Sequence, residues 1–326
     1  MRKLRYSAIV IALAAFLICP EILTEGMLSA HEAVPTANSE AISYVLPWDR
    51  ASSPESSAAQ SWGVSRIEAP QAWQLAQEGK PVTVAVLDSG IAEDNQDLAG
   101  KVIANINFSS SPTGDDLYGH GTQIAGIIAA IAPRCQLMNI KVADDTGRCQ
   151  PSVVARGIIW AADHGADVIN ASLCVKSSPE LEEAVNYAWS QGAILVAAAG
   201  NEGRSKPSYP AGYANCLAVA ALDEDDSLAM LSNHGDWVDI AAPGYHIPTI
   251  SPEAQDVYSS GTSAAAAHVS GAAALVFSIA QDTSGNGSIN DEVQRAIENS
   301  CSPITTDGTG KGCVNAFQAV AQALLS

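Results

Sequence analysis

Three side chains of the 326-residue sequence, Asp88, His120 and Ser263, are of types that together perform nucleophilic catalysis. A serine hydroxyl is a poor nucleophile until a base within hydrogen-bond reach takes its proton, and histidine commonly serves as that base. A carboxylate can hold the imidazole in one tautomer and stabilise its charged form. Each residue alone also has a plain structural interpretation, as a turn after a strand, the start of a helix or a helix N-cap.

The residues around these three form motifs that occur together in one protein family. The motifs are LDSGI at Leu87–Ile91, YGHGTQIAG at Tyr118–Gly126, VINASL at Val168–Leu173, AAAGNEG at Ala197–Gly203, DIAAPG at Asp239–Gly244 and SGTSAAAAHVSG at Ser260–Gly271. Their types, order and spacing resemble the subtilisin-like serine peptidases, or subtilases, from about Trp62 to the C-terminus. The resemblance implies a three-layer α/β sandwich with a mainly parallel central sheet. It also implies a serine endopeptidase that works through an acyl-enzyme, with protein or peptide substrates.

The resemblance assigns a role to each site residue. His120 is expected to take the proton from Ser263, and Asp88 to orient the imidazole. Asn201 corresponds to the family's oxyanion-hole asparagine. Substrate-binding residues are expected in two stretches, Ser172, Leu173 and Cys174 in one, and Ala198, Ala199 and Gly200 in the other. Relatives commonly have glycines where this chain has Cys174 and Val175, which predicts a narrower groove and a preference for small or medium apolar P1 residues.

The elements that must position these residues can be read from apolar runs and helical spacing. Apolar runs predict strands at 82–86, 137–142, 193–199 and 216–221, and a further strand that begins at 168. Helical spacing predicts helices at 120–130, 152–164 and 179–191, the second with Ser152 as its N-cap. Strands alternating with helices predict a parallel sheet that is covered on both faces. Asp88 and Asn201 both follow apolar runs, so both are expected at the carboxyl edge of that sheet, where ligands bind.

Composition and the N-terminus predict where the protein works. A basic start, an apolar stretch ending at Pro20 and small residues near Ala30 predict a signal peptide over 1–30. Residues 31–60 are predicted to be a linker or short pro-segment, and 61–326 the peptidase domain. The expected location is therefore secreted or periplasmic, without stable membrane insertion; the alternative is that the apolar stretch is kept as a membrane anchor. The net charge of −19 argues against nucleic acid as a partner. We expect a monomer.

Six cysteines remain once Cys19 is removed with the signal peptide. An even number in an exported chain predicts disulfides, with Cys301–Cys313 as the preferred pair. The alternative is that several are buried free thiols. The bond between Tyr209 and Pro210 is expected to be cis, as at the matching position of relatives.

No cofactor and no tight calcium site are expected. Asp97 matches a calcium ligand of many relatives, but the loop that completes their site is missing here. Residues 282–289 resemble the start of an EF-hand loop, yet Val293 stands where that pattern has glutamate. We therefore favour a surface loop leading into a helix capped by Asn290, with a weak surface calcium site as the alternative.

Two other functions remain open from the sequence. One is a specialised processing peptidase for a single partner precursor, weakly favoured by the narrowed strand at Cys174 and Val175. The other is a non-enzymatic binding module on a peptidase scaffold, against which the complete set of Asp88, His120 and Ser263 argues.

Overall fold

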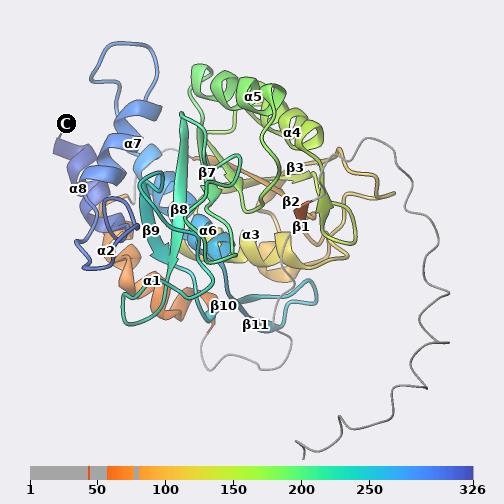
Figure 1. Ribbon diagram of the computed structural model, residues 1–326, viewed down its shortest axis with the longest axis horizontal. Helices are drawn as coiled ribbons and strands as arrows, with labels where there is room; N and C mark the ends of the chain where they lie inside the picture. The colour runs from red at the N-terminus through yellow and green to blue at the C-terminus, as the bar shows by residue number, and fades with distance from the viewer. Residues whose placement is uncertain (1–42, 45–56, 77–80, 326) are drawn as a thin grey trace, which may run out of the picture. The chain divides into compact units, whose positions relative to one another are not determined.

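A seven-stranded parallel sheet forms the centre of the structure, with the strand order β3-β4-β2-β6-β7-β8-β9 (Figure 1). The computed structural model describes residues 43–44, 57–76 and 81–325. The strands are β2 (Thr83–Asp88), β3 (Val102–Asn107), β4 (Gln136–Lys141), β6 (Val168–Ala171), β7 (Ile194–Ala198), β8 (Cys216–Leu222) and β9 (Ile240–Pro243). The apolar runs of the sequence form the inner strands, because a strand covered on both faces is apolar throughout. The predicted parallel sheet is confirmed.

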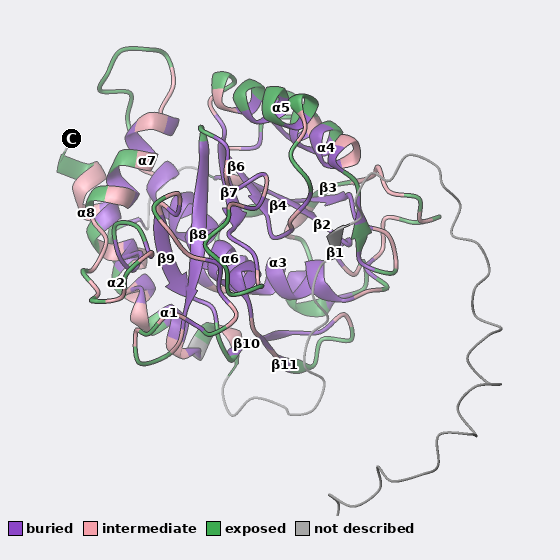
Figure 2. Cartoon of the chain, in the orientation of Figure 1, coloured by how far each residue is buried: buried purple, intermediate pink, exposed green. Residues whose placement is uncertain are grey.

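Helices cover both faces of this sheet and complete three layers. The helices are α1 (Trp62–Arg66), α2 (Ala69–Leu75), α3 (His120–Ile131), α4 (Pro151–Asp163), α5 (Pro179–Ser190), α6 (Thr262–Phe277), α7 (Asn290–Asn299) and α8 (Ala316–Leu325). Leu217 and Val219 of β8 pack into the core that contains α3 and α6, whereas Cys216 and Ala218 pack into the core with α4 and α5. Figure 2 shows α4 and α5 exposed on their outer sides and buried toward the sheet. The three-layer sandwich expected from the sequence is confirmed.

Two helices begin differently from the sequence expectation. α4 starts at Pro151 with Gln150 as its N-cap, so the prediction for Ser152 was wrong. Proline fits the first helical position because its missing N–H would have no intrahelical partner there. The N-cap of α7 is Ile289, so Asn290 does not cap this helix. Its amide instead donates to Trp189 O at 2.9 Å and Ala193 O at 3.5 Å, because tertiary partners compete with local capping.

Two short antiparallel pairs lie outside the main sheet. β1 (Ser43–Tyr44) pairs with β5 (Arg148–Cys149), and β10 (Ile247–Ile250) pairs with β11 (Asp256–Ser259). Short 3-10 helices occur at Ala58–Gln60 and Gln96–Leu98. The Tyr209–Pro210 bond is cis, as predicted. Among the described residues no helix combines the length and apolar character needed to span a membrane. The predicted signal peptide lies outside the described residues.

α6 runs through the core, and every one of its residues is buried. Its small side chains allow close contact with α3. A Cβ added at Gly271 would lie 2.7 Å from Ile131 Cβ, so these two helices touch backbone to side chain at this point. A helix that is apolar on all sides is typical of a protein interior. The small and apolar residues of AAAAHVSGAAALV let this helix lie in the centre of the domain.

The only ionisable side chain of α6, His268, gives a testable pH effect. Burial lowers the pKa of His268 to about 4, whereas the unfolded chain binds this proton near pH 6.5. The free energy of unfolding therefore falls as the pH drops from 6.5 to 4, by up to about 3 kcal/mol. Urea denaturation of the wild type and of His268→Met over this range measures it, and the variant should lack this component.

A second group, Asp239, is partly buried and acts in the opposite direction, so the comparison between the two proteins is essential. Burial raises the pKa of Asp239 to about 6, and protonation of Asp239 therefore favours the folded state as the pH falls. This contribution is the same in wild type and in His268→Met, and it cancels in their difference. Equal pH dependence in the two proteins would contradict the assignment to His268.

Candidate active site

The chain places all three predicted catalytic residues at the carboxyl edge of the sheet. Asp88 is the last residue of β2, and His120 is the first residue of α3. Ser263 is the second residue of α6, so its backbone N–H lies in the first helical turn, where N–H groups lack intrahelical acceptors. The strand and the two helices thus bring together side chains that lie far apart in sequence.

Asp88 and His120 form a buried, charge-assisted pair. His120 Nδ1 lies 2.8 Å from Asp88 Oδ1 and 2.9 Å from Oδ2, and Asp88 is fully buried. The backbone N–H of Ser89 also donates to Asp88 Oδ1 at 2.7 Å. A carboxylate on this side fixes the proton at Nδ1 and leaves the Nε2 lone pair of His120 available as a base.

Ser263 is held close to the segment that directly follows β6. Its hydroxyl donates to the backbone oxygen of Ser172 at 3.1 Å, and the Ser172 hydroxyl donates to Ser263 O at 2.9 Å. Among the described residues no hydrogen bond joins Ser263 to His120. Catalytic hydrogen bonds are often loose without substrate, and a change of serine rotamer redirects the hydroxyl at little cost.

Asn201 lies beside the start of α6 with its amide oriented by Thr262. Asn201 Oδ1 accepts hydrogen bonds from Thr262 N at 2.8 Å and from Thr262 Oγ1 at 3.0 Å. Since both bonds use the amide oxygen, the Nδ2 group points the other way. Asn201 Nδ2 donates no hydrogen bond within the described part of the chain, so it is available to an incoming oxyanion. A Cβ on Gly261 would lie 3.0 Å from this nitrogen.

Comparison with known proteins identifies the family. The chain matches the model of the subtilase family, Peptidase_S8, over residues 79–318. It is 40% identical to thermitase of Thermoactinomyces vulgaris, over 79% of this chain and 95% of thermitase. It is 39% identical to subtilisin BL of Lederbergia lenta, over 78% of this chain and 96% of that protein. The chain belongs to the subtilase family. This subtilase is a serine endopeptidase, a hydrolase that acts on the peptide bonds of protein or peptide substrates.

The six predicted substrate-binding residues of the subtilase form two neighbouring segments. Cys174 Sγ lies 3.7 Å from Ala198 O and so connects the segment after β6 to the end of β7. Beyond it, Val175 bridges to Tyr209. Among the six only Cys174 is partly exposed, while Ser172, Leu173, Ala198, Ala199 and Gly200 are buried. Burial raises the pKa of the Cys174 thiol to about 12, so it is neutral at physiological pH.

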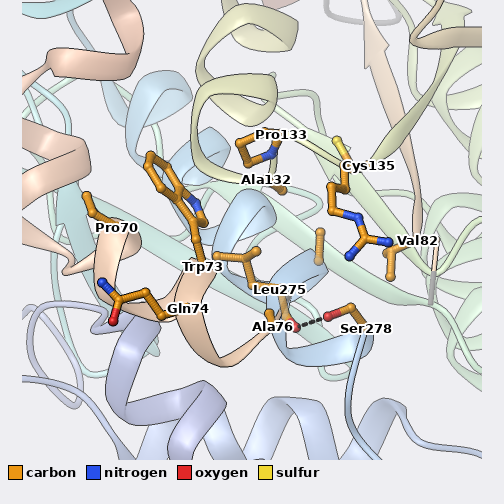
Figure 3. Close-up of a pocket in the computed structure, with 12 residues that line it drawn as sticks. Pro70, Trp73, Gln74, Ala76, Val82, Ala132, Pro133, Cys135, Leu275 and Ser278 are labelled. Carbon is orange, nitrogen blue, oxygen red and sulfur yellow. Dashed lines mark hydrogen bonds between the residues drawn. The ribbon is translucent and has the colours of Figure 1, made fainter. Parts of the chain in front are cut away.

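A cavity of about 490 Å³ lies at the opposite edge of the sheet (Figure 3). Its lining includes Val82, just before β2, and Cys135, just before β4. Trp73 and Leu275 contribute apolar walls from α2 and α6. The six residues of β2 separate this cavity from Asp88 by about 20 Å, so it is not part of the subtilase active site.

Sequence reasoning missed Asp116, whose carboxylate connects the residue after Asp88 with the residues on either side of His120. Its Oδ1 accepts from Ser89 Oγ at 2.8 Å and Gly119 N at 2.8 Å. Its Oδ2 accepts from Thr122 N at 2.8 Å and Thr122 Oγ1 at 2.7 Å. Asp116 therefore ties the residue after Asp88 to the start of α3. The signal available in the sequence was an aspartate four residues before the histidine.

Lys141 was also missed, and its ammonium group binds both the loop after β2 and the loop before α3. It is fully buried at the end of β4, beside Asp88 in the parallel register. Its Nζ forms an ion pair with Asp145 at 2.9 Å and donates to the backbone oxygens of Ser89 and Asp115. A buried ammonium needs such partners because its desolvation is unfavourable. The apolar strand around it gave no sign that Lys141 would be buried.

The predicted disulfide between Cys301 and Cys313 is not formed. Five described cysteines are free thiols, as the alternative interpretation held: Cys135, Cys174, Cys216, Cys301 and Cys313. Cys313 pairs with Ser302 in an antiparallel bridge, so Cys301 is offset by one residue from the position opposite Cys313. Cys301 Sγ instead lies 3.3 Å from Ile297 O. Burial raises the pKa of both thiols to about 12 and keeps them protonated.

In the loop that resembles an EF-hand, the side chain of the first aspartate accepts hydrogen bonds from the backbone of the loop itself. Asp282 accepts from the N–H groups of Gly285 at 2.6 Å, Asn286 at 3.2 Å and Gly287 at 2.8 Å. These bonds lower the pKa of Asp282. Within the described residues there is no group of three or more His, Cys, Asp or Glu that could hold a metal ion.

Proposed function

We propose that Asp88, His120 and Ser263 form the catalytic triad of this endopeptidase and that Asn201 completes its oxyanion hole. The observation that carries the proposal is the buried Asp88–His120 pair, with Nδ1 at 2.8 Å and 2.9 Å from the two carboxylate oxygens. This pairing leaves Nε2 of His120 as the base. Ser263 and Asn201 lie at the same edge of the sheet, joined through Thr262.

The reaction follows from these positions. Ser263 Oγ attacks the carbonyl carbon of the substrate and transfers its proton to His120 Nε2. The tetrahedral oxyanion accepts hydrogen bonds from Asn201 Nδ2 and from the Ser263 backbone N–H. The C–N bond then breaks, and His120 donates the proton to the leaving amine. Water, deprotonated by His120, attacks the acyl-enzyme and releases the acid product with Ser263 restored. No step needs a cofactor, and a weak surface calcium site would lie outside this chemistry.

A fluorophosphonate probe tests the triad directly. The probe phosphonylates a serine oxygen only where a base activates it, so it should form one adduct on Ser263. Mass spectrometry of the digested protein locates the adduct. His120→Ala keeps Ser263 but removes the base and should react at least a hundredfold more slowly. An adduct on another residue, or a folded wild type that does not react, would overturn the assignment.

The substrate is proposed to bind as an extended strand along Ser172, Leu173 and Cys174, with Ala198, Ala199 and Gly200 forming the other wall. Cys174 Sγ beside Ala198 O supports a pocket narrowed by the thiol. We therefore propose a preference for small or medium apolar P1 residues.

Replacing Cys174 with glycine is expected to widen this pocket. The ratio of kcat/KM for a peptide with P1 phenylalanine to one with P1 alanine should rise about tenfold or more, because one small group in an apolar pocket is worth about 1–3 kcal/mol. A peptide series that differs only at P1 measures the ratio. A wild type that already prefers large aromatic or basic P1 residues would contradict the proposal.

The narrowed groove also supports the second candidate, a processing peptidase for one precursor. Digestion of casein separates the two: rapid, general cleavage favours a broad endopeptidase, whereas resistance of casein favours the specialist.

The N-terminal organisation is part of the proposal. A signal peptide over 1–30 and a linker or short pro-segment over 31–60 would deliver a monomeric domain, 61–326, to a secreted or periplasmic location. N-terminal sequencing of the mature protein tests the two boundaries together.

A further inference from the structure

Asn201 lies on an irregular loop after β7. Its side chain can point in a fixed direction only if other residues hold the backbone of this loop in place. Thr262 holds the amide oxygen of Asn201 and, through its hydroxyl, the backbone N–H of Gly200, but the rest of the backbone around Asn201 needs a further partner. The support comes from Asn233, which follows β8 and is fully buried. No sequence motif singled out this residue. The bonds of Asn233 reach both flanks of Asn201.

The hydrogen bonds of Asn233 enclose the loop from Ala199 to Arg204. Its backbone N–H donates to Gly200 O at 2.8 Å. Its Nδ2 donates to Ala199 O at 2.9 Å, Glu202 Oε2 at 2.9 Å and Ser208 Oγ at 3.1 Å. Its Oδ1 accepts from Glu202 N and Arg204 N, each at 3.1 Å. The backbone of Asn233 therefore fixes Gly200, immediately before Asn201, and its side chain fixes Ala199 and Glu202 on the two sides.

Only a primary amide fits this arrangement. The oxygen of Asn233 uses its two acceptor positions for two backbone N–H groups, and the nitrogen shares its two protons among three acceptors. A carboxylate could accept but not donate, and a hydroxyl is too small to reach both flanks. The asparagine is also matched to Gly200, which has φ +107° and whose added Cβ would lie 2.3 Å from Asn233 Nδ2. Gly200 thus lets the amide approach the backbone closely.

We propose that Asn233 is a positioning residue for the oxyanion hole: it fixes the loop so that Asn201 Nδ2 points at the developing oxyanion. This inference rests on the proposed role of Asn201. Asn233 is buried behind the loop and faces no reacting atom, and besides the flanks of Asn201 it holds Ala199 and Gly200 of the proposed pocket wall. A displacement of about 1 Å at a catalytic group can lower the rate about a hundredfold, so loss of this support should appear in turnover.

The test is a kinetic double-mutant cycle with Asn201→Ala and Asn233→Ala on a peptide amide substrate. Asn201→Ala should lower kcat by a factor on the order of 10²–10³. Asn233→Ala should lower kcat about tenfold or more, with KM changed less than about twofold. In the double variant the kcat should equal that of Asn201→Ala, because a misplaced donor cannot matter once it is gone. Factors that multiply would overturn the proposal.

A binding measurement separates positioning from a purely structural role. A peptide aldehyde forms an oxyanion on Ser263, so its Ki should rise in Asn233→Ala by the factor by which kcat falls. The Ki of the matching peptide alcohol should change less than about twofold, because it has no carbonyl group and places no oxyanion in the hole. If Asn233→Ala does not fold, Asn233→Ser, which keeps a polar group, is measured in the same way. An unchanged aldehyde Ki in a folded variant would overturn the proposal.

Asn290→Ala is the matched control. Asn290 is also a buried asparagine, and it donates to two backbone carbonyls away from the site. Its replacement should lower Tm by an amount similar to Asn233→Ala but leave kcat and the aldehyde Ki unchanged. If the proposed role of Asn201 itself were wrong, Asn201→Ala would retain full kcat, so this outcome can be distinguished from failure of the role of Asn233. If Asn201→Ala loses kcat while Asn233→Ala does not, only the positioning role of Asn233 fails.

Discussion

Replacing Ser263 with alanine is expected to lower kcat for a peptide substrate about 10⁶-fold, the magnitude measured for subtilisin itself. The nucleophile is lost, while the Asp88–His120 pair at 2.8 Å and the oxyanion donors remain. The residual rate should still exceed the uncatalysed reaction about 10³–10⁴-fold, because the oxyanion hole and substrate binding persist. Active-site titration and steady-state kinetics on one purified preparation measure the loss.

Ser270→Ala is the control for this prediction. Ser270 lies on the same helix, is fully buried and donates to Asn170 Oδ1 at 2.9 Å. Its replacement removes a buried hydroxyl from α6 that reaches Ser263 only through Asn170 and Ser172, so kcat should fall less than about tenfold. A Ser263→Ala protein that keeps more than about a hundredth of wild-type kcat would show that another nucleophile carries the reaction.

Replacing Asp88 with asparagine is expected to lower kcat about 10⁴-fold. The Ser89 N–H, which donates to Oδ1 at 2.7 Å, would hold the amide oxygen of the new side chain. The amide NH₂ would then take the place of Oδ2, which lies 2.9 Å from His120 Nδ1. Two donors cannot face each other, so the imidazole proton would move to Nε2. In that tautomer His120 cannot accept the proton of Ser263.

This loss should appear in kcat with little change in KM or in Tm, because asparagine has the shape of aspartate. Steady-state kinetics and thermal denaturation of Asp88→Asn check the three quantities together. A fall of less than about tenfold in kcat would contradict the proposed role of Asp88, because the wrong tautomer should be nearly inactive.

The parts of the site that lie at the ends of apolar runs could be predicted from the sequence. The run before Asp88 could be read as a buried strand, and it forms β2 up to Asp88 itself. The parallel arrangement then places Asp88 at the ligand-binding edge by a general rule. The run before Asn201 works in the same way, since β7 ends at Ala198. The local apolar pattern and the parallel strand direction were sufficient to predict where Asp88 and Asn201 lie.

The supporting residues could not be predicted because their partners are distant in sequence. Asn233 stands in a Ser-Asn-His-Gly stretch that reads as an ordinary turn, yet it bonds to the loop around Asn201. Lys141 ends an apolar strand, and only the three-dimensional arrangement supplies its oxygen partners. The start of α4 was misplaced by one residue because a serine near a helix start resembles a cap, whereas Pro151 already begins the helix.

The complete burial of α6 has a consequence for how the enzyme survives its own activity. A peptidase in solution meets other copies of itself, and they can cut only segments that open locally. The helix that carries Ser263 is enclosed by the sheet, α3 and the C-terminal helices, so it can become accessible only when most of the domain opens. The amide protons of α6 should therefore be among the slowest to exchange with deuterium. Self-digestion would then begin in surface loops, and the nucleophile would be among the last parts of the chain to be lost.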